Sequence, residues 1–388
     1  MNVKSDRENV IPTTSGANAK AGRLASLDVF RGLTVAAMIV ANNAGSGVAY
    51  PALRHAQWDG WTPTDLIFPW FLFIVGVSIT FALSKRRDDP GGAAPRPVLG
   101  KIARRTLIIF GLGIALAGFP TYSNWATIRI PGVLQRIALC YAAASLIFLA
   151  TRVRGQVLAI VGLLVGYWLV MTRVPVPSFG AGDLARGHDL ASYLDRLLLP
   201  GHIYRPDYDP EGLLSTLPAV ATTLIGVLAG HWLRSGRDRH EIDSGLFVAG
   251  TAVVVAGWAW GSSFPINKAL WTSSFVLLTG GLALIGLATC YWVVDLRGIR
   301  RWSYPFRVLG VNPIAAYVLA AAGARLLNQP MLNRGEGGPI TVHRFIHDGY
   351  LLPHLAPIDA SLAYALLLLL ACGLVVAILD ALGLHLRA

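Results

Sequence analysis

Apolar segments about as long as a lipid bilayer is thick recur along almost the whole chain. A helix that crosses the hydrocarbon core of about 30 Å needs roughly 20 predominantly apolar residues. About ten windows approach this length, and they cover residues 24–43, 65–83, 106–120, 131–151, 156–171, 213–233, 245–260, 270–294, 306–326 and 361–382. Because backbone polar groups in lipid must be satisfied within their own segment, such windows form helices. The sequence therefore predicts an all-α fold, a polytopic integral membrane helical bundle with about ten transmembrane helices.

The composition agrees with this fold class. Of the 388 residues, 54% are hydrophobic and 14% are charged, whereas soluble domains are about half apolar and a quarter charged. In a soluble domain a net charge of +12 would suggest nucleic-acid binding. Here the basic residues concentrate in alternate connectors between the apolar windows, which is typical of a topology signal. No nucleic-acid partner is therefore predicted.

The distribution of Lys and Arg predicts the orientation in the membrane. Of the 33 basic residues, 22 lie in the two terminal segments and in alternate connectors, and positive connectors stay in the cytoplasm. Both termini are therefore predicted to be cytoplasmic. Residues 1–23 are polar and are expected to form a disordered cytoplasmic tail, while residues 24–388 form a single transmembrane domain. The connectors near 44–64, 172–212 and 328–360 are expected to face outward.

Polar side chains stand out in the first two apolar windows and in the connector between them. The first window holds Asp28, Arg31 and Asn42, the connector holds His55, and the second window opens on Asp65. Such groups are costly in or beside a bilayer, so each is a candidate functional residue until a structural partner explains it. Asp28 and Arg31 can pair across one helical turn. A single histidine beside tryptophans is, on this evidence alone, more often a packing or interface residue.

The sequence shows no phosphate-binding loop and no metal signature with firm spacing. His343 and His347 stand four residues apart and would share a helix face, as two metal ligands can. No carboxylate or cysteine completes that set convincingly. No metal site is therefore predicted, and loop or interface roles are favoured for both histidines.

Six segments of unusual composition occur in a fixed order between about residues 23 and 326. They read SLDVFRGLTVAAMIVANN, RHAQWDGWTPTDLIFPWFLFIVG, RIPGVLQRIALCY, YDPEGLLSTLPAVATTLIGVLAG, PINKALWTSSFVLL and LGVNPIAAYV. With these segments the chain resembles the heparan-α-glucosaminide N-acetyltransferase family, and in particular its short bacterial members of the NagX type. The resemblance covers most of the predicted membrane core.

The resemblance implies a transmembrane acetyltransferase in the bacterial inner membrane, plausibly a homodimer. Such an enzyme moves the acetyl group of cytoplasmic acetyl-CoA, the acyl donor, to the amino group of a glucosamine at the outer, periplasmic side. The family's active-site histidine maps onto His55, and its active-site asparagine maps onto Asn42, beside Asn43. A free amino sugar is the more natural acceptor here, because the large amino-terminal domain of the animal enzymes is absent from this sequence.

Acetyl transfer to an amine needs a proton acceptor and a group that stabilises the oxyanion. His55 suits the first role, since imidazole titrates near neutral pH, and Asn42 suits the second or else satisfies carbonyls at the helix end. Asp65 either orients His55 or is a helix-start carboxylate favoured by the helix dipole.

The donor's phosphates need basic groups, for which the candidates are Arg31, Arg104, Arg105 and Arg136. Candidates for binding the acceptor sugar are Asp209, Glu211, Asn267 and Lys268, with a structural salt bridge as the alternative.

Two alternatives remain open at this point. An amino-sugar permease would also use about ten helices, but many transporters contain paired inverted repeats, and no second copy of the polar segments is visible. Acetyl transfer through an acetyl-histidine intermediate is the other alternative. Because an acetyl-imidazole reacts with water and His55 is expected to lie in a wet outer vestibule, direct transfer with His55 as general base is favoured.

Overall fold

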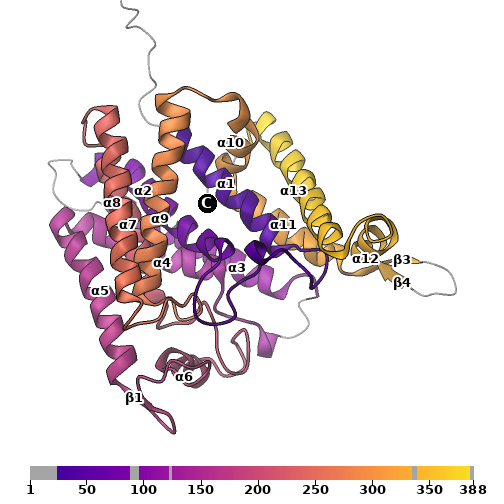
Figure 1. Cartoon of the computed structure of the whole chain (residues 1–388), viewed down its shortest axis with the longest axis horizontal. Coiled ribbons are helices and arrows are strands. Elements are labelled where there is room, and N and C mark those ends of the chain that lie inside the picture. Colours follow the sequence, from indigo (N-terminus) through magenta and orange to yellow (C-terminus); the bar gives the residue numbers. More distant parts are fainter. Residues whose placement is uncertain (1–23, 88–95, 122–124, 334–338, 385–388) are drawn as a thin grey trace, which may run out of the picture.

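The structure, a computed structural model, describes residues 24–87, 96–121, 125–333 and 339–384. The predicted tail at residues 1–23 lies outside this part. The described chain is almost entirely helical, as Figure 1 shows. This agrees with the predicted all-α class.

Eight of the described helices are long and apolar enough to cross a membrane. They are α1 (Ala25–Asn42), α2 (Ile67–Arg87), α4 (Val133–Ala150), α5 (Val153–Arg173), α7 (Thr216–Leu233), α8 (Arg239–Trp260), α9 (Ser273–Tyr291) and α13 (Pro357–Ala381). α3 (Arg96–Gly118) is also long, but it begins ten residues before the predicted window at 106 and carries Lys101, Arg104 and Arg105 in its first half. The chain is therefore a multi-pass membrane protein.

The window predicted as one helix at 306–326 is broken in the structure. α10 (Tyr304–Val311) and α11 (Pro313–Leu327) meet at an angle of 77°. Pro313 has no backbone N–H to continue the α10 ladder, and its ring clashes with the preceding turn. The expectation of a single straight helix here was wrong, and if the pair counts as one span the described chain has up to nine.

Glycines bring two pairs of helices into backbone contact. A Cβ on Gly76 of α2 would lie 1.8 Å from the Thr223 carbonyl oxygen on α7, and a Cβ on Gly226 of α7 would lie 1.9 Å from the Phe73 carbonyl oxygen on α2. Gly32 of α1 makes the same kind of close backbone contact with α10. Small residues at such crossings permit the close approach that stabilises helix pairs in membranes. α2 and α7 therefore pack with their backbones in direct contact.

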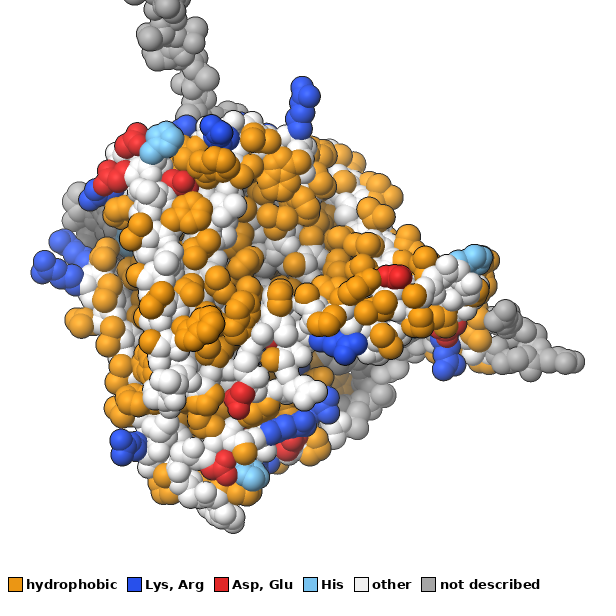
Figure 2. Space-filling model, viewed as in Figure 1, with side chains coloured by type: hydrophobic (Ala, Val, Ile, Leu, Met, Phe, Trp, Pro, Cys, Tyr) orange, Lys and Arg blue, Asp and Glu red, His pale blue; other side chains and the backbone are white. Residues whose placement is uncertain are grey.

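The helices differ in how much of their surface the protein covers. α7 is 72% buried over its apolar window, whereas α5, α8 and α13 are each 28% buried. In Figure 1 these three helices run along the sides of the bundle. Figure 2 shows hydrophobic side chains over most of the middle of the molecule, with most of the charged groups toward its upper and lower edges. This distribution is that of a bundle with an apolar belt facing lipid.

The connectors contain short elements that sequence reasoning did not resolve. α6 (Leu190–Leu198) lies in the loop predicted at 172–212 and is capped by Asp189, whose Oδ1 accepts a hydrogen bond of 2.8 Å from the Ser192 amide. Two small antiparallel hairpins pair β1 (Pro175–Val176) with β2 (Gly180–Ala181) and β3 (Pro330–Asn333) with β4 (Pro339–Thr341). α12 (Val342–Ile346) follows β4 directly.

Candidate functional site

Two cavities lie one beyond the other between α1, α2, α4 and the α10–α11 break. The first, of about 130 Å³, has Asn42, His55, Glu211 and Lys268 in its wall. The second, of about 380 Å³, reaches toward the opposite end of the bundle and has Arg31, Ser78, Arg105 and Tyr141 in its wall. We call them the His55 cavity and the Arg105 cavity. Both are bordered by the same four apolar residues, which are Phe71, Leu134, Ile137 and Ile314.

The turn before α2 fixes the Asp65 carboxylate. Pro63 opens a short 3-10 turn (Pro63–Leu66), and Asp65 Oδ2 accepts hydrogen bonds of 3.0 Å from the Thr62 amide and 3.1 Å from the Thr62 hydroxyl group. The Ala56 amide donates to the same oxygen at 3.0 Å. This is a capping box with an extra donor from the preceding connector. Asp65 is fully buried, and its second oxygen, Oδ1, points toward the site.

His55 contacts that second oxygen. Its Nδ1 lies 2.6 Å from Asp65 Oδ1, and its side chain is 50% exposed. Asp65 thus closes the turn before α2 and also contacts His55, so its geometry is compatible with both of the roles considered for it. With the proton on Nδ1 donated to Asp65, the lone pair of the ring is on Nε2. Within the described part of the chain, Nε2 has no hydrogen-bond partner, so it is available to a substrate.

A bridge between two distant connectors brings Lys268 to the same point. The Gly60 amide donates to the Ile266 carbonyl oxygen at 2.7 Å, and Asn267 Nδ2 donates to Asp59 Oδ1 at 3.1 Å. Lys268 Nζ then lies 2.9 Å from His55 Nδ1 and 3.2 Å from Asp65 Oδ1. Asn267 is fully buried and lines neither cavity. Its position is that of a structural tie, whereas Lys268 faces the cavity.

The electrostatics of this trio limit its protonation states. A protonated Nδ1 that donates to Asp65 cannot accept from Lys268, so the ammonium group donates to the carboxylate instead. Burial lowers the pKa of Lys268, while the charges of Asp65 and Glu211 oppose that shift. The Lys268 ammonium group is thus held by the Asp65 carboxylate, at the edge of the His55 cavity.

The two asparagines at the end of α1 have different environments. Asn42 is in the wall of the His55 cavity. Asn43 donates from Nδ2 to the Ile39 carbonyl oxygen at 2.7 Å, which is the helix-end role considered for an amide here. The structure thus brings Asn42 together with His55, Asp65 and Lys268.

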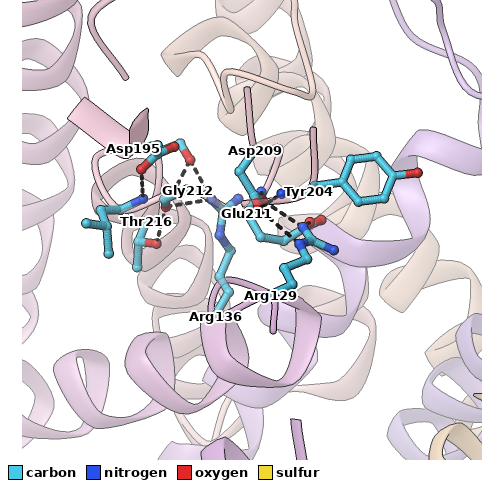
Figure 3. A network of polar contacts seen from close by, with 10 residues as sticks. Arg129, Arg136, Asp195, Tyr204, Asp209, Glu211, Gly212 and Thr216 are labelled. Atoms are coloured by element: carbon cyan, nitrogen blue, oxygen red, sulfur yellow. Dashed lines mark hydrogen bonds and ion pairs between the residues drawn. The ribbon is translucent and has the colours of Figure 1, made fainter. Parts of the chain in front are cut away.

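A second cluster of charged residues, shown in Figure 3, contains Glu211. Glu211 also lies in the wall of the His55 cavity. Arg129 donates from Nε and Nη2 to the two oxygens of Asp209 at 2.9 and 2.6 Å, and it also pairs with Glu211. The Tyr204 ring stacks under the guanidinium group at 4.7 Å. Burial alone would lower the pKa of Arg129, but the pairing with Asp209 and Glu211 outweighs it and raises that pKa above its usual value. Asp209 is buried in this cluster, so of the two carboxylates it is Glu211 that reaches the cavity.

Sequence reasoning did not single out Arg129. It lies at the start of RIPGVLQRIALCY, one of the six segments of unusual composition, whereas Arg136 in the same segment was predicted to bind the donor. A signal was present, because alternation of the apolar windows puts the connector that holds Arg129 on the same side of the membrane as the YDPEG segment, which offers two carboxylates. Opposite charges on the same predicted side are natural partners, although which would meet depends on the fold.

Arg136 lies behind this cluster rather than in a cavity wall. It is 1% exposed, and Nη2 donates to the Gly212 carbonyl oxygen at 3.0 Å and to the Ser215 hydroxyl group. Its guanidinium group lies 5.0 Å from the centre of the Trp271 ring. Nearby, Asp195 Oδ1 accepts from the Leu213 amide at 2.8 Å, while Oδ2 has no partner within the described chain. Arg136 is therefore placed to hold the start of α7.

The other three arginines predicted to bind the donor, Arg31, Arg104 and Arg105, differ in their surroundings. Arg31 pairs with Asp28 at 3.0 Å, as predicted, and it also donates to the Gly310 carbonyl oxygen at 3.0 Å and to Ser78 Oγ at 2.9 Å. Arg105 lies over the Tyr141 ring at 4.7 Å and lines the Arg105 cavity. Arg104 is exposed and lines neither cavity. Arg31 and Arg105 are thus together at one cavity, and Arg104 is not with them.

Comparison with known proteins places the chain in a family. Residues 23–261 match the family described as heparan-alpha-glucosaminide N-acetyltransferase, catalytic. The chain is 32% identical over 368 residues to the Homo sapiens heparan-alpha-glucosaminide N-acetyltransferase, covering 80% of this chain and 54% of that protein. It is 31% identical over 358 residues to the Mus musculus protein of the same name, covering 77% and 53%. The chain thus spans about half the length of these curated relatives. Because the matched segment makes up more than half of the chain, the protein belongs to the heparan-alpha-glucosaminide N-acetyltransferase family.

Proposed function

We propose that the protein is a transmembrane N-acetyltransferase that transfers the acetyl group of cytoplasmic acetyl-CoA to the amino group of glucosamine or a related amino sugar at the outer side. The observation that carries this proposal is the His55–Asp65 pair at the wall of a cavity that borders a second cavity with basic side chains. Family membership supplies the reaction type, since both curated relatives are named as N-acetyltransferases.

The Arg105 cavity suits the donor. It holds the guanidinium group of Arg105, whose Nε is buried without a partner in the described chain, so this group can receive an anionic oxygen. The apolar residues shared by the two cavities then border the path of the pantetheine arm. A thioester carried past Phe71 and Ile314 arrives beside Asn42 and His55.

The His55 cavity suits an amine acceptor. Glu211 and Lys268 give it one negative and one positive side chain, and each is held by a partner, Arg129 and Asp65 respectively. Hydroxyl groups of a sugar can bond to both kinds of group. An amine placed against His55 Nε2 is then held close to the thioester, which is the proximity that bimolecular transfer needs.

In the proposed reaction, the amine nitrogen attacks the thioester carbonyl carbon. Asn42 donates to the oxygen as negative charge develops there, and His55 Nε2 takes the proton from nitrogen. The carbon–sulfur bond then breaks, and coenzyme A leaves as the thiol after protonation. Asp65 keeps the Nδ1 proton in place throughout and stabilises the imidazolium ion, the role of the third member of a catalytic triad.

The proposal places this chain in the bacterial inner membrane with His55 at the periplasmic face, as a homodimer. Purified full-length protein in detergent, given acetyl-labelled acetyl-CoA and a panel of amines, tests the reaction. The expected result is release of coenzyme A thiol together with acetylated glucosamine, both lost in His55→Ala. If none of the amines is acetylated by the intact protein, or if His55→Ala retains the rate, the proposal is wrong.

A further inference from the structure

The amine of Lys268 shares the His55 cavity with the groups assigned to acetyl transfer. Its Nζ is 2.9 Å from His55 Nδ1, and the side chain is 20% exposed. Lys101, the other lysine whose side chain the structure describes, is exposed on α3 and lines neither cavity. A primary amine is thus built into the place where the proposed reaction acetylates a primary amine.

We propose that Lys268 is a self-acetylation site: when the acceptor sugar is absent, its Nζ takes the acetyl group of acetyl-CoA. The inference rests on the proposed function, because it needs the thioester in the His55 cavity. It identifies a modification that would control the same site.

The chemistry is that of the main reaction with a different nitrogen. The neutral Nζ attacks the thioester carbonyl carbon, an amide bond forms, and the carbon–sulfur bond breaks. After the attack, Nζ releases one of its two protons to the His55–Asp65 pair. This proton then passes to the departing sulfur, so coenzyme A leaves as the thiol. No oxidant or further reactant is needed.

The surroundings of Lys268 decide when this happens. The ammonium form is held by Asp65 at 3.2 Å, which protects it, but burial lowers the pKa of the group and so raises the share of neutral amine. An acceptor sugar in the cavity competes for the same thioester. Acetylation of Lys268 is therefore expected to be slow, and slowest when the acceptor is abundant.

Acetylation would inactivate the site for two reasons. It removes the positive charge that faces Asp65, so the ion pair is lost and His55 becomes the sole side-chain partner of Asp65 Oδ1 among the residues described at this point. The added acetyl group also occupies part of a cavity of about 130 Å³. A cell rich in acetyl-CoA and poor in acceptor would thus switch the enzyme off.

The test uses full-length protein in detergent with acetyl-labelled acetyl-CoA and no acceptor, followed over time by peptide mass spectrometry. The expected result is one acetyl group on the Lys268 peptide, formed at least about tenfold faster than on exposed Lys101, because the thioester is held nearby. The adduct should resist hydroxylamine, as an amide does. Saturating glucosamine should slow it severalfold, Lys268→Arg should abolish it, and Lys101→Arg should leave it unchanged.

Three results would overturn the inference. One is an unmodified Lys268 in a preparation that then acetylates added glucosamine. Another is acetylation of Lys101 at the same rate as Lys268, which would indicate that acetyl-CoA free in solution modifies both lysines. The third is a hydroxylamine-sensitive adduct confined to His55. Failure of the proposed function is separate, since it is seen as the absence of acetylated amine in the glucosamine reaction.

Discussion

Asn267 donates a hydrogen bond from Nδ2 to Oδ1 of Asp59 over 3.1 Å, and its own Oδ1 accepts from the Leu270 amide at 2.9 Å. The first bond joins the connector after α1 to the connector before α9, and the second shapes the turn that presents Lys268. Together with the Gly60–Ile266 backbone bond, this amide holds the two connectors at the place where His55 and Lys268 meet. The charged trio therefore depends on a residue that touches neither cavity.

The substitution Asn267→Ala is expected to lower kcat about 10- to 100-fold by displacing Lys268 and His55. It should also lower the thermal midpoint, because the buried Leu270 amide and the Asp59 carboxylate lose their hydrogen-bond partner. Asn328→Ala is the control, since among the described residues that side chain bonds only to the Ala324 carbonyl oxygen, within its own helix end. A full kcat in Asn267→Ala would contradict the link between this tie and the site.

Asp65→Asn tests the orientation of His55. An amide at this position can donate to Nδ1, which would leave the proton on Nε2 and remove the base. We expect kcat to fall about 10³- to 10⁴-fold, as when the corresponding aspartate of a catalytic triad is changed, with KM for acetyl-CoA nearly unchanged. Asp183→Asn is a matched control, because Asp183 contacts His188 Nδ1 at 2.8 Å in an exposed loop. A loss of less than tenfold in Asp65→Asn would exclude a triad-like role.

Arg105 and Arg104 are adjacent on α3 but differ in environment, and sequence alone predicted both as donor ligands. Only Arg105 lines a cavity. Arg105→Ala is expected to raise KM for acetyl-CoA about tenfold with little change in kcat, the pattern of lost uniform binding, while Arg104→Ala leaves both unchanged. Initial rates over a range of acetyl-CoA concentrations measure this. Equal effects of the two substitutions would mean that surface charge, rather than the cavity, attracts the donor.

The sequence predicted the helices well because hydropathy acts locally. Each predicted window falls on a helix or on the bent α10–α11 pair, and the Asp28–Arg31 contact follows from helical spacing alone. The position of the break was also visible as Pro313, although a proline in a membrane helix does not by itself decide between a kink and a break.

The sequence did not predict the partners that come from distant segments. His55 and Lys268 are separated by 213 residues, and Arg129 and Asp209 by 80. Charge and hydropathy place such residues on one predicted side of the membrane, but which of them touch is decided by helix packing and by ties such as Asn267–Asp59. The Asp65–His55 contact spans ten residues, which is why it was among the expected alternatives.

Gly226→Ala tests the contact between α2 and α7. The new methyl group would lie 1.9 Å from the Phe73 carbonyl oxygen, so the helices must separate, at an expected cost of about 1–3 kcal/mol. Gly162→Ala in α5 is the control, since a Cβ there meets no atom of the described chain within 4 Å. Thermal midpoints in one detergent compare the two. A midpoint for Gly226→Ala no lower than that of the control would show that the contact is not close in solution.

Asp195 should give the protein a measurable dependence of stability on pH. Burial raises the pKa of Asp195 to about 6, helped by the charge of Asp209, although the Leu213 amide and Arg136 oppose the shift. In the unfolded chain the pKa is about 3.9. Below about pH 4 the carboxyl group is protonated in both states, so its contribution to stability is fully present. As pH rises through about 6 the folded state must release this proton, and stability falls by up to about 3 kcal/mol.

Asp195→Asn keeps the shape of the protonated group and cannot ionise. The variant is expected to lose this decline between about pH 4 and 7 and to be more stable than the parent at pH 8, with the two proteins similar near pH 4. Thermal midpoints across this range measure the difference. Asp183→Asn provides the comparison, because the Ala185 amide and His188 lower the pKa of that exposed carboxyl group and place its effect below pH 4. If the thermal midpoints of Asp195→Asn and the parent change in parallel with pH, Asp195 is ionised in the folded protein across this range, and the prediction is wrong.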